Sequence, residues 1–325
     1  MITKGKLKYI LRRSKQKAWH IIEDSYRSSL PSTKQQTTVN DKEIRVVGLR
    51  RSGNHAIINW IRAQAPKNTT FINHTRIKGN PYRDVYEDQL FLQQNPTLKG
   101  WRCDDIEWWK REAKGDFSHK DCLIYSYEDQ EIERVVHPAF EKRHNFYLGK
   151  SAKRYDVIIM RDPFNLFASR LKGNKPRVNA RNFDLMSVYS RTRNLAELWV
   201  TYAQECLGET NFLPNNKIFL GYNQWFTDIE YRKSIANQLN IEFSDAGFDE
   251  VVTAGGIGSS FDGTSFNSNA DQMDVLNRWQ SFAEDPSYLD LFKTPELIEY
   301  SCRLFGHLPG TETLIEKLEG HRKPI

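Results

Sequence analysis

The chain has 325 residues, a formal net charge of +6 and a sequence pI near 9.0. With 39% hydrophobic residues it can bury a sizeable core, so its composition excludes a disordered or fibrous protein. Its four cysteines form no Cys-x-x-Cys pair, which predicts a reducing, cytoplasmic environment, and no His, Cys or carboxylate residues show metal-ligand spacing.

Residues 1–40 differ from the rest and are expected to form a basic helical arm and a polar linker. Seven cations precede Trp19, namely Lys4, Lys6, Lys8, Arg12, Arg13, Lys15 and Lys17. Hydrophobic residues that fit one face of an amphipathic helix are Leu7, Ile10, Leu11, Trp19 and Ile22. Such a helix either makes peripheral contact with an anionic membrane or packs on the domain, and its apolar runs are too short to span a bilayer or form a secretion signal. Residues 41–325 are expected to form one large domain.

A loop with a glycine at each end follows the β-branched strand predicted at residues 44–49. Its sequence is Gly48-Leu49-Arg50-Arg51-Ser52-Gly53-Asn54-His55, and an apolar helical run begins at Ala56. Backbone N–H groups and a helix N-terminus in such a loop can surround an anion. A nucleotide triphosphatase needs Lys after the second glycine and then a Ser or Thr hydroxyl for Mg²⁺. Because Asn54 and His55 occupy these positions, the loop predicts a phosphate-containing ligand held without a loop-bound metal.

Two more strands are predicted before residue 130, at 70–73 and 122–127. His74 follows the first and Glu128 the second, so both side chains are expected at the edge of the sheet where open α/β proteins bind ligands. The segment between the strands holds three tryptophans with charged neighbours, namely Trp101, Trp108 and Trp109 with Arg102, Asp104 and Asp105. This segment fits either a sugar-binding surface or core packing.

The strand predicted at 155–160 leads directly into Arg161. Asp162 fits a helix N-cap and Pro163 fits the first helical position. Arg161 therefore lies at a strand end, where its planar fork suits a phosphate, and Ser169 adds a hydroxyl about two helical turns later. The basic loop at 172–177, with Arg181, either faces an acidic acceptor or is solvated.

A last strand is predicted at 217–222. The alternation of strands with helical stretches predicts an α/β fold with a mainly parallel central sheet, helices on both faces and a P-loop-like strand–loop–helix.

In order, these segments resemble the sulfotransferases that use 3′-phosphoadenosine 5′-phosphosulfate (PAPS). The family's first loop commonly reads Pro-Lys-Ser-Gly-Thr-Thr, and the run from Arg50 to His55 falls on it residue for residue. The family's second motif, an Arg at a strand end with Ser eight positions later, is matched by Arg161 and Ser169. The strand ending in Tyr222 and the turn Gly258-Ser259-Ser260-Phe261 look like the family's adenine-contacting segments.

The chain also departs from the family pattern. Arg51 replaces the usual loop lysine, and Ala56 replaces the adenine-stacking Trp, with Trp60 one turn further along. No Arg-Lys-Gly triplet precedes Asn277-Arg278-Trp279, so Arg278 is the candidate for the missing cation.

The resemblance implies a PAPS site whose product is 3′,5′-ADP, with no metal required. The residues expected to bind this donor are Arg50, Arg51, Ser52, Gly53, Asn54, His55, Ala56, Arg161, Ser169, Tyr222, Ser259 and Phe261. Arg51 is also expected to neutralise the departing phosphate. A general base must accept the proton of the acceptor hydroxyl, and the resemblance favours Glu128 over His74, with His55 and Asp129 as further alternatives.

The sequence thus predicts a PAPS-dependent sulfotransferase acting on a hydroxyl, of a carbohydrate rather than a small phenol. Two alternatives stay open: a P-loop kinase or related transferase, which Asn54 and His55 disfavour, and a non-catalytic basic module for nucleotide or nucleic acid. Nucleic acid is not an expected partner, because the basic residues are scattered and no helix-turn-helix, RRM or zinc-finger pattern is present.

Overall fold

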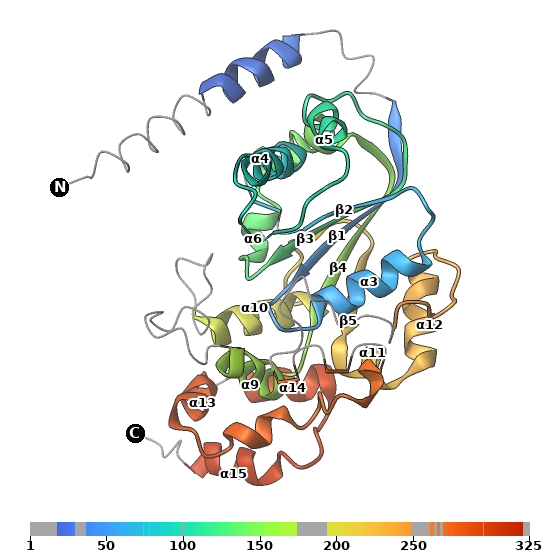
Figure 1. Ribbon diagram of the computed structural model, residues 1–325. Coiled ribbons are helices and arrows are strands. Elements are labelled where there is room, and N and C mark those ends of the chain that lie inside the picture. The colour runs from blue at the N-terminus through green and yellow to red at the C-terminus, as the bar shows by residue number, and fades with distance from the viewer. Residues whose placement is uncertain are drawn as a thin grey trace, which may run out of the picture.

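The computed structural model describes most of the chain around one central sheet (Figure 1). The described residues are 18–29, 37–73, 75–77, 79–98, 100–173, 194–248, 261–262, 265–266, 269–294 and 296–320. The candidates His74 and Ser259 lie outside them, as do Arg181 and most of the basic loop that begins at residue 172.

The described part contains a five-stranded, all-parallel sheet in the order β2-β3-β1-β4-β5. The strands are β1 (Thr38–Gly48), β2 (Thr69–Ile72), β3 (Lys120–Glu128), β4 (Lys150–Met160) and β5 (Lys217–Gly221). The predicted parallel α/β sheet is confirmed. β1 begins at Thr38, six residues before the predicted strand and just inside the expected linker, because residues 38–43 add a polar extension to the apolar run.

Helices cover both faces of the sheet, since successive strand residues alternate between two cores. Val47, Tyr125 and Ile158 belong to the larger core, whereas their neighbours Val46 and Ile124 belong to the smaller one. The smaller core is closed by α3 (Asn54–Gln64), α11 (Tyr222–Thr227) and α12 (Ile229–Gln238).

The larger core lies on the other face. Its helices are α4 (Pro81–Gln94), α5 (Ile106–Ala113), α6 (Ile132–Val135), α7 (Pro138–Glu141), α8 (His144–Leu148), α9 (Pro163–Gly173), α10 (Leu195–Cys206), α13 (Pro286–Asp290), α14 (Leu297–Phe305) and α15 (Glu312–Gly320). Short 3-10 turns complete the described C-terminal part at η2 (Ala270–Gln272), η3 (Arg278–Phe282) and η4 (Leu291–Lys293).

Local sequence fixes where several of these helices begin. The Asp162 carboxylate accepts the Asn165 N–H at 2.8 Å and Pro163 opens α9, as the sequence predicted. A capping box between Asn194 and Glu197 starts α10. These caps set the points at which the chain leaves the sheet edge.

A buried polar network ties the amino-terminal halves of β1 and β4 to α8. The Glu43 carboxylate accepts hydrogen bonds from Tyr125 Oη (2.8 Å) and Ser151 Oγ, and contacts His144 Nε2 (2.7 Å) and Arg154 Nε (3.1 Å). Burial alone would raise the pKa of Glu43, but His144, Arg154 and Ser151 outweigh it and lower the pKa to about 2.

We expect Glu43→Gln to lower the free energy of unfolding by about 3–5 kcal/mol at neutral pH, because it removes the buried charge that Arg154 and His144 contact. Since the folded-state pKa is below the ordinary 4.5, this stabilisation is complete above about pH 4.5 and disappears as the pH falls through about 2. Denaturant unfolding of both proteins between pH 7 and pH 2 should show the difference shrinking. The exposed Glu299→Gln is the control, and a difference that does not change with pH would contradict the network's role.

Within the described residues, no helix combines the length and apolar composition needed to cross a bilayer.

Candidate functional site

The loop between β1 and α3 has the backbone of a tight anion-binding turn. Arg51 and Gly53 both have positive φ, at 72° and 88°. A Cβ at Gly53 would lie 2.1 Å from the Tyr222 ring, so this position requires glycine. As the N-cap of α3, Gly53 has no side chain to offer the first helical N–H groups, which point out of the helix towards any bound anion.

The parallel register brings the predicted site residues to one edge of the sheet. Gly48, at the end of β1, pairs with Glu128 on one side and with Ile159 on the other, and Met160 pairs with Gly221. The loop, Glu128 and the residues that follow Met160 and Gly221 therefore share the carboxyl edge. β1 lies between β3 and β4, where the connections diverge, which is the usual ligand position in open α/β sheets.

Glu128 is 8% exposed and is bound to the loop. Its Oε1 accepts a hydrogen bond from Asn54 Nδ2 at 2.8 Å, and His55 Nε2 lies 3.9 Å from the same oxygen. Arg50 Nε lies 3.8 Å from Oε2. This carboxylate is thus oriented by Asn54, which occupies the position of the triphosphatase lysine, and it lies beside the loop.

The adjacent carboxylate, Asp129, has a different environment. It is fully buried with φ 54°, and its oxygens contact Arg170 Nη1 at 2.8 and 3.1 Å. Oδ1 also accepts the Arg50 backbone N–H at 2.9 Å. Asp129 therefore holds the loop and α9 together, which argues against it as the base. The sequence did not reveal this Arg170 pair, although Arg170 directly follows the predicted Ser169.

Arg161 and Ser169, which the sequence suggests for the same phosphate, contact each other, and Arg278 joins them. Arg161 Nη1 donates to Ser169 Oγ at 3.2 Å and to the Arg51 carbonyl at 3.4 Å, while Arg161 Nη2 donates to the Val275 carbonyl. Arg278 Nη1 lies 3.5 Å from the same Ser169 oxygen. Burial, and then the charge of Arg278, lower the pKa of Arg161 to about 10. Arg278 Nη2 also pairs with the Asp262 carboxylate at 2.9 Å, whereas Arg161 donates to neutral oxygens, so an anion beside Arg161 would stabilise this cluster.

Two buried donors in this region also point to a ligand. The Ser52 hydroxyl and Arg161 Nε are buried, and among the described residues neither has a hydrogen-bond partner. Buried polar groups are nearly always hydrogen-bonded, and those that are not commonly contact a ligand, ion or water.

The aromatic residues expected to contact adenine are packed rather than exposed. Tyr222 is 5% exposed and stacks on Phe226 with ring centroids 5.9 Å apart. The Arg161 guanidinium lies 5.0 Å from the centroid of the Tyr222 ring. Phe261 lies 5.0 Å below the Arg278 guanidinium. Trp60 is fully buried against Trp225, so it does not take the place of the family's stacking Trp at Ala56.

The tryptophan segment lies at the other end of β3. The Trp108 ring is 4.9 Å from that of Trp109 and 5.7 Å from Lys120 Nζ, at the first residue of β3. Trp101 is 62% exposed and packs edge-on against Trp109. A nine-residue strand spans roughly 27 Å, which separates these rings from Glu128.

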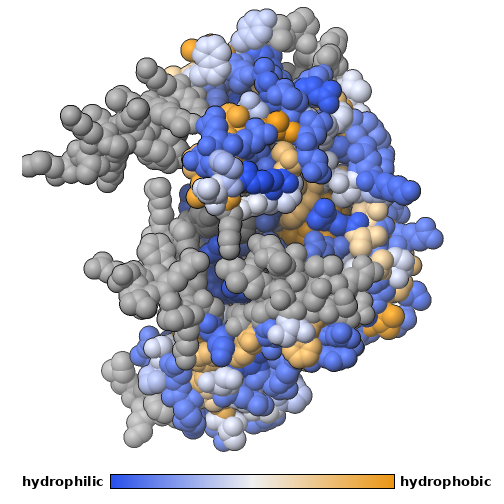
Figure 2. Space-filling view, in the orientation of Figure 1, coloured by the Kyte–Doolittle hydropathy of each residue, from blue (hydrophilic) through white to orange (hydrophobic). Residues whose placement is uncertain are grey.

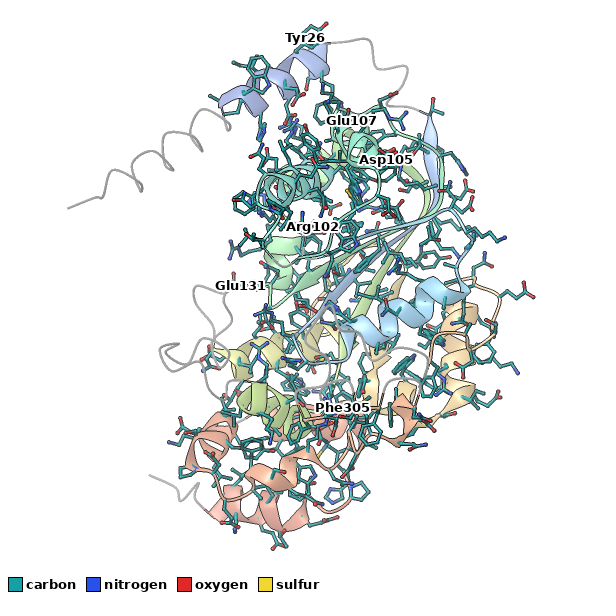
Figure 3. All side chains as sticks on the ribbon, viewed as in Figure 1. Tyr26, Arg102, Asp105, Glu107, Glu131 and Phe305 are labelled. Carbon is teal, nitrogen blue, oxygen red and sulfur yellow. The ribbon has the colours of Figure 1, made fainter. Side chains whose placement is uncertain are left out.

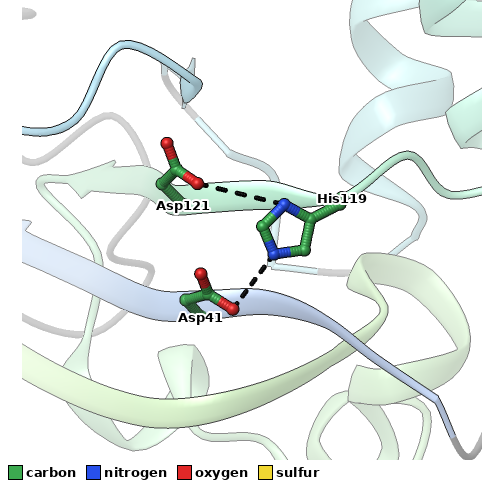
Figure 4. Close-up of side chains that lie close together, drawn as sticks. All are labelled: Asp41, His119 and Asp121. Carbon is green, nitrogen blue, oxygen red and sulfur yellow. Dashed lines mark hydrogen bonds and ion pairs between the residues drawn. The ribbon is translucent and has the colours of Figure 1, made fainter.

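A second polar group lies at the same amino edge. His119 Nε2 is 3.1 Å from Asp41 Oδ1 and its Nδ1 is 3.9 Å from Asp121 Oδ1 (Figure 4). Their ligand atoms are close enough to hold a metal ion, although the residues are exposed or half-buried. The sequence spacing did not indicate them because Asp41 is far from the other two along the chain.

No protein-family model and no curated protein matches the chain. Among solved structures it is similar to mouse sulfotransferase SULT7A1 complexed with PAP, with 11% identity and a TM-score of 0.43 over 89% of this chain and 92% of that one. It is also similar to the sulfotransferase domains of the Synechococcus PCC 7002 olefin synthase and of the curacin biosynthetic pathway. Their identities are 10% and 12% and their TM-scores 0.40 and 0.43, over 78% and 82% of this chain and 98% of each domain.

Proposed function

We propose that this protein is a sulfotransferase that moves the sulfuryl group of PAPS to an acceptor hydroxyl. The main observation behind the proposal is that two groups able to bind an anion lie next to each other at one edge of the sheet. One is the loop from Gly48 to His55, and the other is the Arg161–Ser169–Arg278 cluster, linked to the loop by the 3.4 Å contact from Arg161 to the Arg51 carbonyl. A donor with separate 5′ and 3′ phosphates would supply one anion to the loop and one to the cluster.

In the proposed complex, the α3 N-terminus and Arg51 hold the 5′-phosphosulfate, while Arg161 and Ser169 hold the 3′-phosphate with Arg278. Charge-assisted hydrogen bonds from a planar guanidinium favour a phosphate over a neutral ribose hydroxyl. The Asn54 amide nitrogen donates to the Leu49 carbonyl and to Glu128 Oε1, so it ties the loop to the end of β3.

The reaction requires an in-line displacement at sulfur. The acceptor oxygen forms the new S–O bond, the bridging S–O bond breaks, and 3′,5′-ADP leaves with the bonding electrons. Glu128 takes the acceptor's proton, and Arg51 neutralises the charge that develops on the leaving phosphate. Asn54 holds Glu128 Oε1, and Oε2, which lies 3.8 Å from Arg50 Nε, is the oxygen proposed to take the proton.

The choice of acceptor class depends on the aromatic segment around Trp101. The tryptophans and carboxylates around Trp101, which in the sequence favour a carbohydrate, lie at the amino edge of the sheet, away from the loop. We propose that the acceptor is a hydroxyl, and carbohydrates are the first class of acceptor to test.

The Mg²⁺ dependence of ligand binding tests this proposal against a P-loop kinase. We expect 3′,5′-ADP to raise the thermal midpoint equally with Mg²⁺ and with EDTA, because His55 replaces the metal-binding hydroxyl of a P-loop. ATP with Mg²⁺ should stabilise the protein less. Loss of the 3′,5′-ADP shift on chelation, or a larger shift with ATP and Mg²⁺, would contradict the proposal, and a preference for an oligonucleotide over both ligands would indicate a nucleic-acid module.

A further inference from the structure

The helix at residues 18–29 is attached to the domain by its polar side. Asp24 Oδ1 lies 2.7 Å from Arg83 Nη2 and His20 Nε2 lies 2.7 Å from Glu87 Oε1, so both ion pairs join it to α4. The Arg27 guanidinium lies 4.0 Å above the Phe146 ring of α8. Positions 20, 23, 24 and 27 have the spacing of one helical face, and they are the buried or half-buried ones.

The solvent-facing side of this helix carries large apolar residues, together with the small residues Ser25, Ser28 and Ser29. Trp19 is 66%, Ile22 60% and Tyr26 67% exposed, at the spacing of a second helical face, and Ile21 beside them is 67% exposed. Tyr26 extends away from α4 and α5 in Figure 3. Of the large hydrophobic side chains exposed in the described part, half belong to this short helix; the others are Phe91, Leu98, Trp101 and Ile229.

This arrangement is the reverse of an ordinary surface helix, which buries its apolar side and exposes its charges. The Asp24–Arg83 ion pair and the His20–Glu87 contact hold the helix in the reversed orientation. The rest of the described surface visible in Figure 2 is mostly hydrophilic, with small separate hydrophobic areas. The exposed side of the helix is therefore a surface that suits an apolar partner.

The charge of the sequence that precedes this helix indicates which kind of partner the surface binds. Seven Lys or Arg residues lie within positions 4–17, and no Asp or Glu occurs before Glu23. Trp and Tyr favour the boundary between lipid headgroups and acyl chains, and clustered cations are attracted to anionic lipids. We propose that the face formed by Trp19, Ile22 and Tyr26 docks on an anionic bilayer surface, in the plane of the headgroups.

Co-sedimentation of the full chain with vesicles tests the proposal. We expect binding to phosphatidylcholine vesicles that contain roughly 30% phosphatidylserine, little binding to phosphatidylcholine alone, and weaker binding when salt rises from about 0.1 M to about 0.5 M. Trp19→Ser/Ile22→Ser/Tyr26→Ser should reduce binding to the anionic vesicles at least about tenfold and leave the thermal midpoint unchanged, because these side chains face solvent.

The chain offers a matched control. Ile22 and Ile229 are both exposed helical isoleucines, at 60% and 50%, so Ile22→Ser should weaken vesicle binding and Ile229→Ser should not. Absence of wild-type binding, or equal binding by the triple variant, would overturn the proposal. A lipid-independent dimer that the triple variant abolishes would also overturn it, by showing that a second copy covers this face. None of these results depends on the donor site.

Discussion

Glu128→Gln should lower sulfuryl transfer by about 10²–10⁴-fold while leaving 3′,5′-ADP affinity within about twofold of wild type. Glutamine keeps the size of the side chain and an oxygen that can still accept the Asn54 hydrogen bond, but it cannot take a proton from the acceptor. Initial rates with labelled PAPS, together with calorimetric titration of 3′,5′-ADP, measure the two effects separately. Near-normal transfer by this variant would eliminate Glu128 as the base.

The neighbouring carboxylate provides a control for this experiment. Asp129→Asn should lower the free energy of unfolding by about 3–5 kcal/mol, because it breaks the buried pair with Arg170, and it should affect donor binding and transfer together. His74→Ala tests the second candidate base. If the large selective loss of transfer occurs in His74→Ala and not in Glu128→Gln, the base is the histidine.

Arg161→Ala should remove most of the preference for 3′,5′-ADP over 5′-AMP. Losing a charge-assisted contact to the 3′-phosphate costs about 1.5–3 kcal/mol, which corresponds to roughly a 10- to 150-fold fall in the affinity ratio. Affinity for 5′-AMP should change little, because it lacks that phosphate. Titration of both nucleotides into wild type and variant gives the ratio directly, and an unchanged ratio would show that Arg161 only supports the Val275 and Arg51 carbonyls.

Two further variants separate a phosphate contact from loss of structure. Ser169→Ala should reduce the same ratio by a smaller factor, since it removes one neutral hydroxyl. Arg303→Ala removes an exposed arginine of α14 that pairs with Glu209, so it should leave both affinities unchanged. A fall in both affinities in Arg303→Ala would show that the assay responds to general loss of charge.

The fold was predictable because its signals are local. β-branched runs marked the strands, and the glycine loop and the Asp162-Pro163 cap marked where helices follow them. Parallel strands bring their carboxyl ends together, so residues that directly follow a strand, such as Glu128 and Arg161, could be placed at one edge from sequence alone. The polar start of β1 was missed because residues 38–43 lack an apolar run.

The contacts within the site were not predictable, because they join residues far apart in the chain. Nothing in the sequence couples Asn54 to Glu128 or Asp129 to Arg170, and these pairs depend on the packing of α3 and α9 at the sheet edge. The burial of Trp60 depends in the same way on contact with Trp225. The sequence predicts an amphipathic helix that includes Trp19 and Ile22, but which face of the helix at 18–29 meets the domain depends on the partners that α4 supplies.

The central claim is that one sheet edge binds a nucleotide through two separate phosphates. Calorimetric titration of the wild-type protein with 3′,5′-ADP, with 5′-AMP and with ATP plus Mg²⁺ tests it most directly. The proposed site predicts that 3′,5′-ADP binds at least about tenfold tighter than 5′-AMP, since Arg161, Ser169 and Arg278 would contact the 3′-phosphate, and tighter than ATP with Mg²⁺. Equal affinity for 3′,5′-ADP and 5′-AMP, or tighter binding of ATP with Mg²⁺, would contradict it.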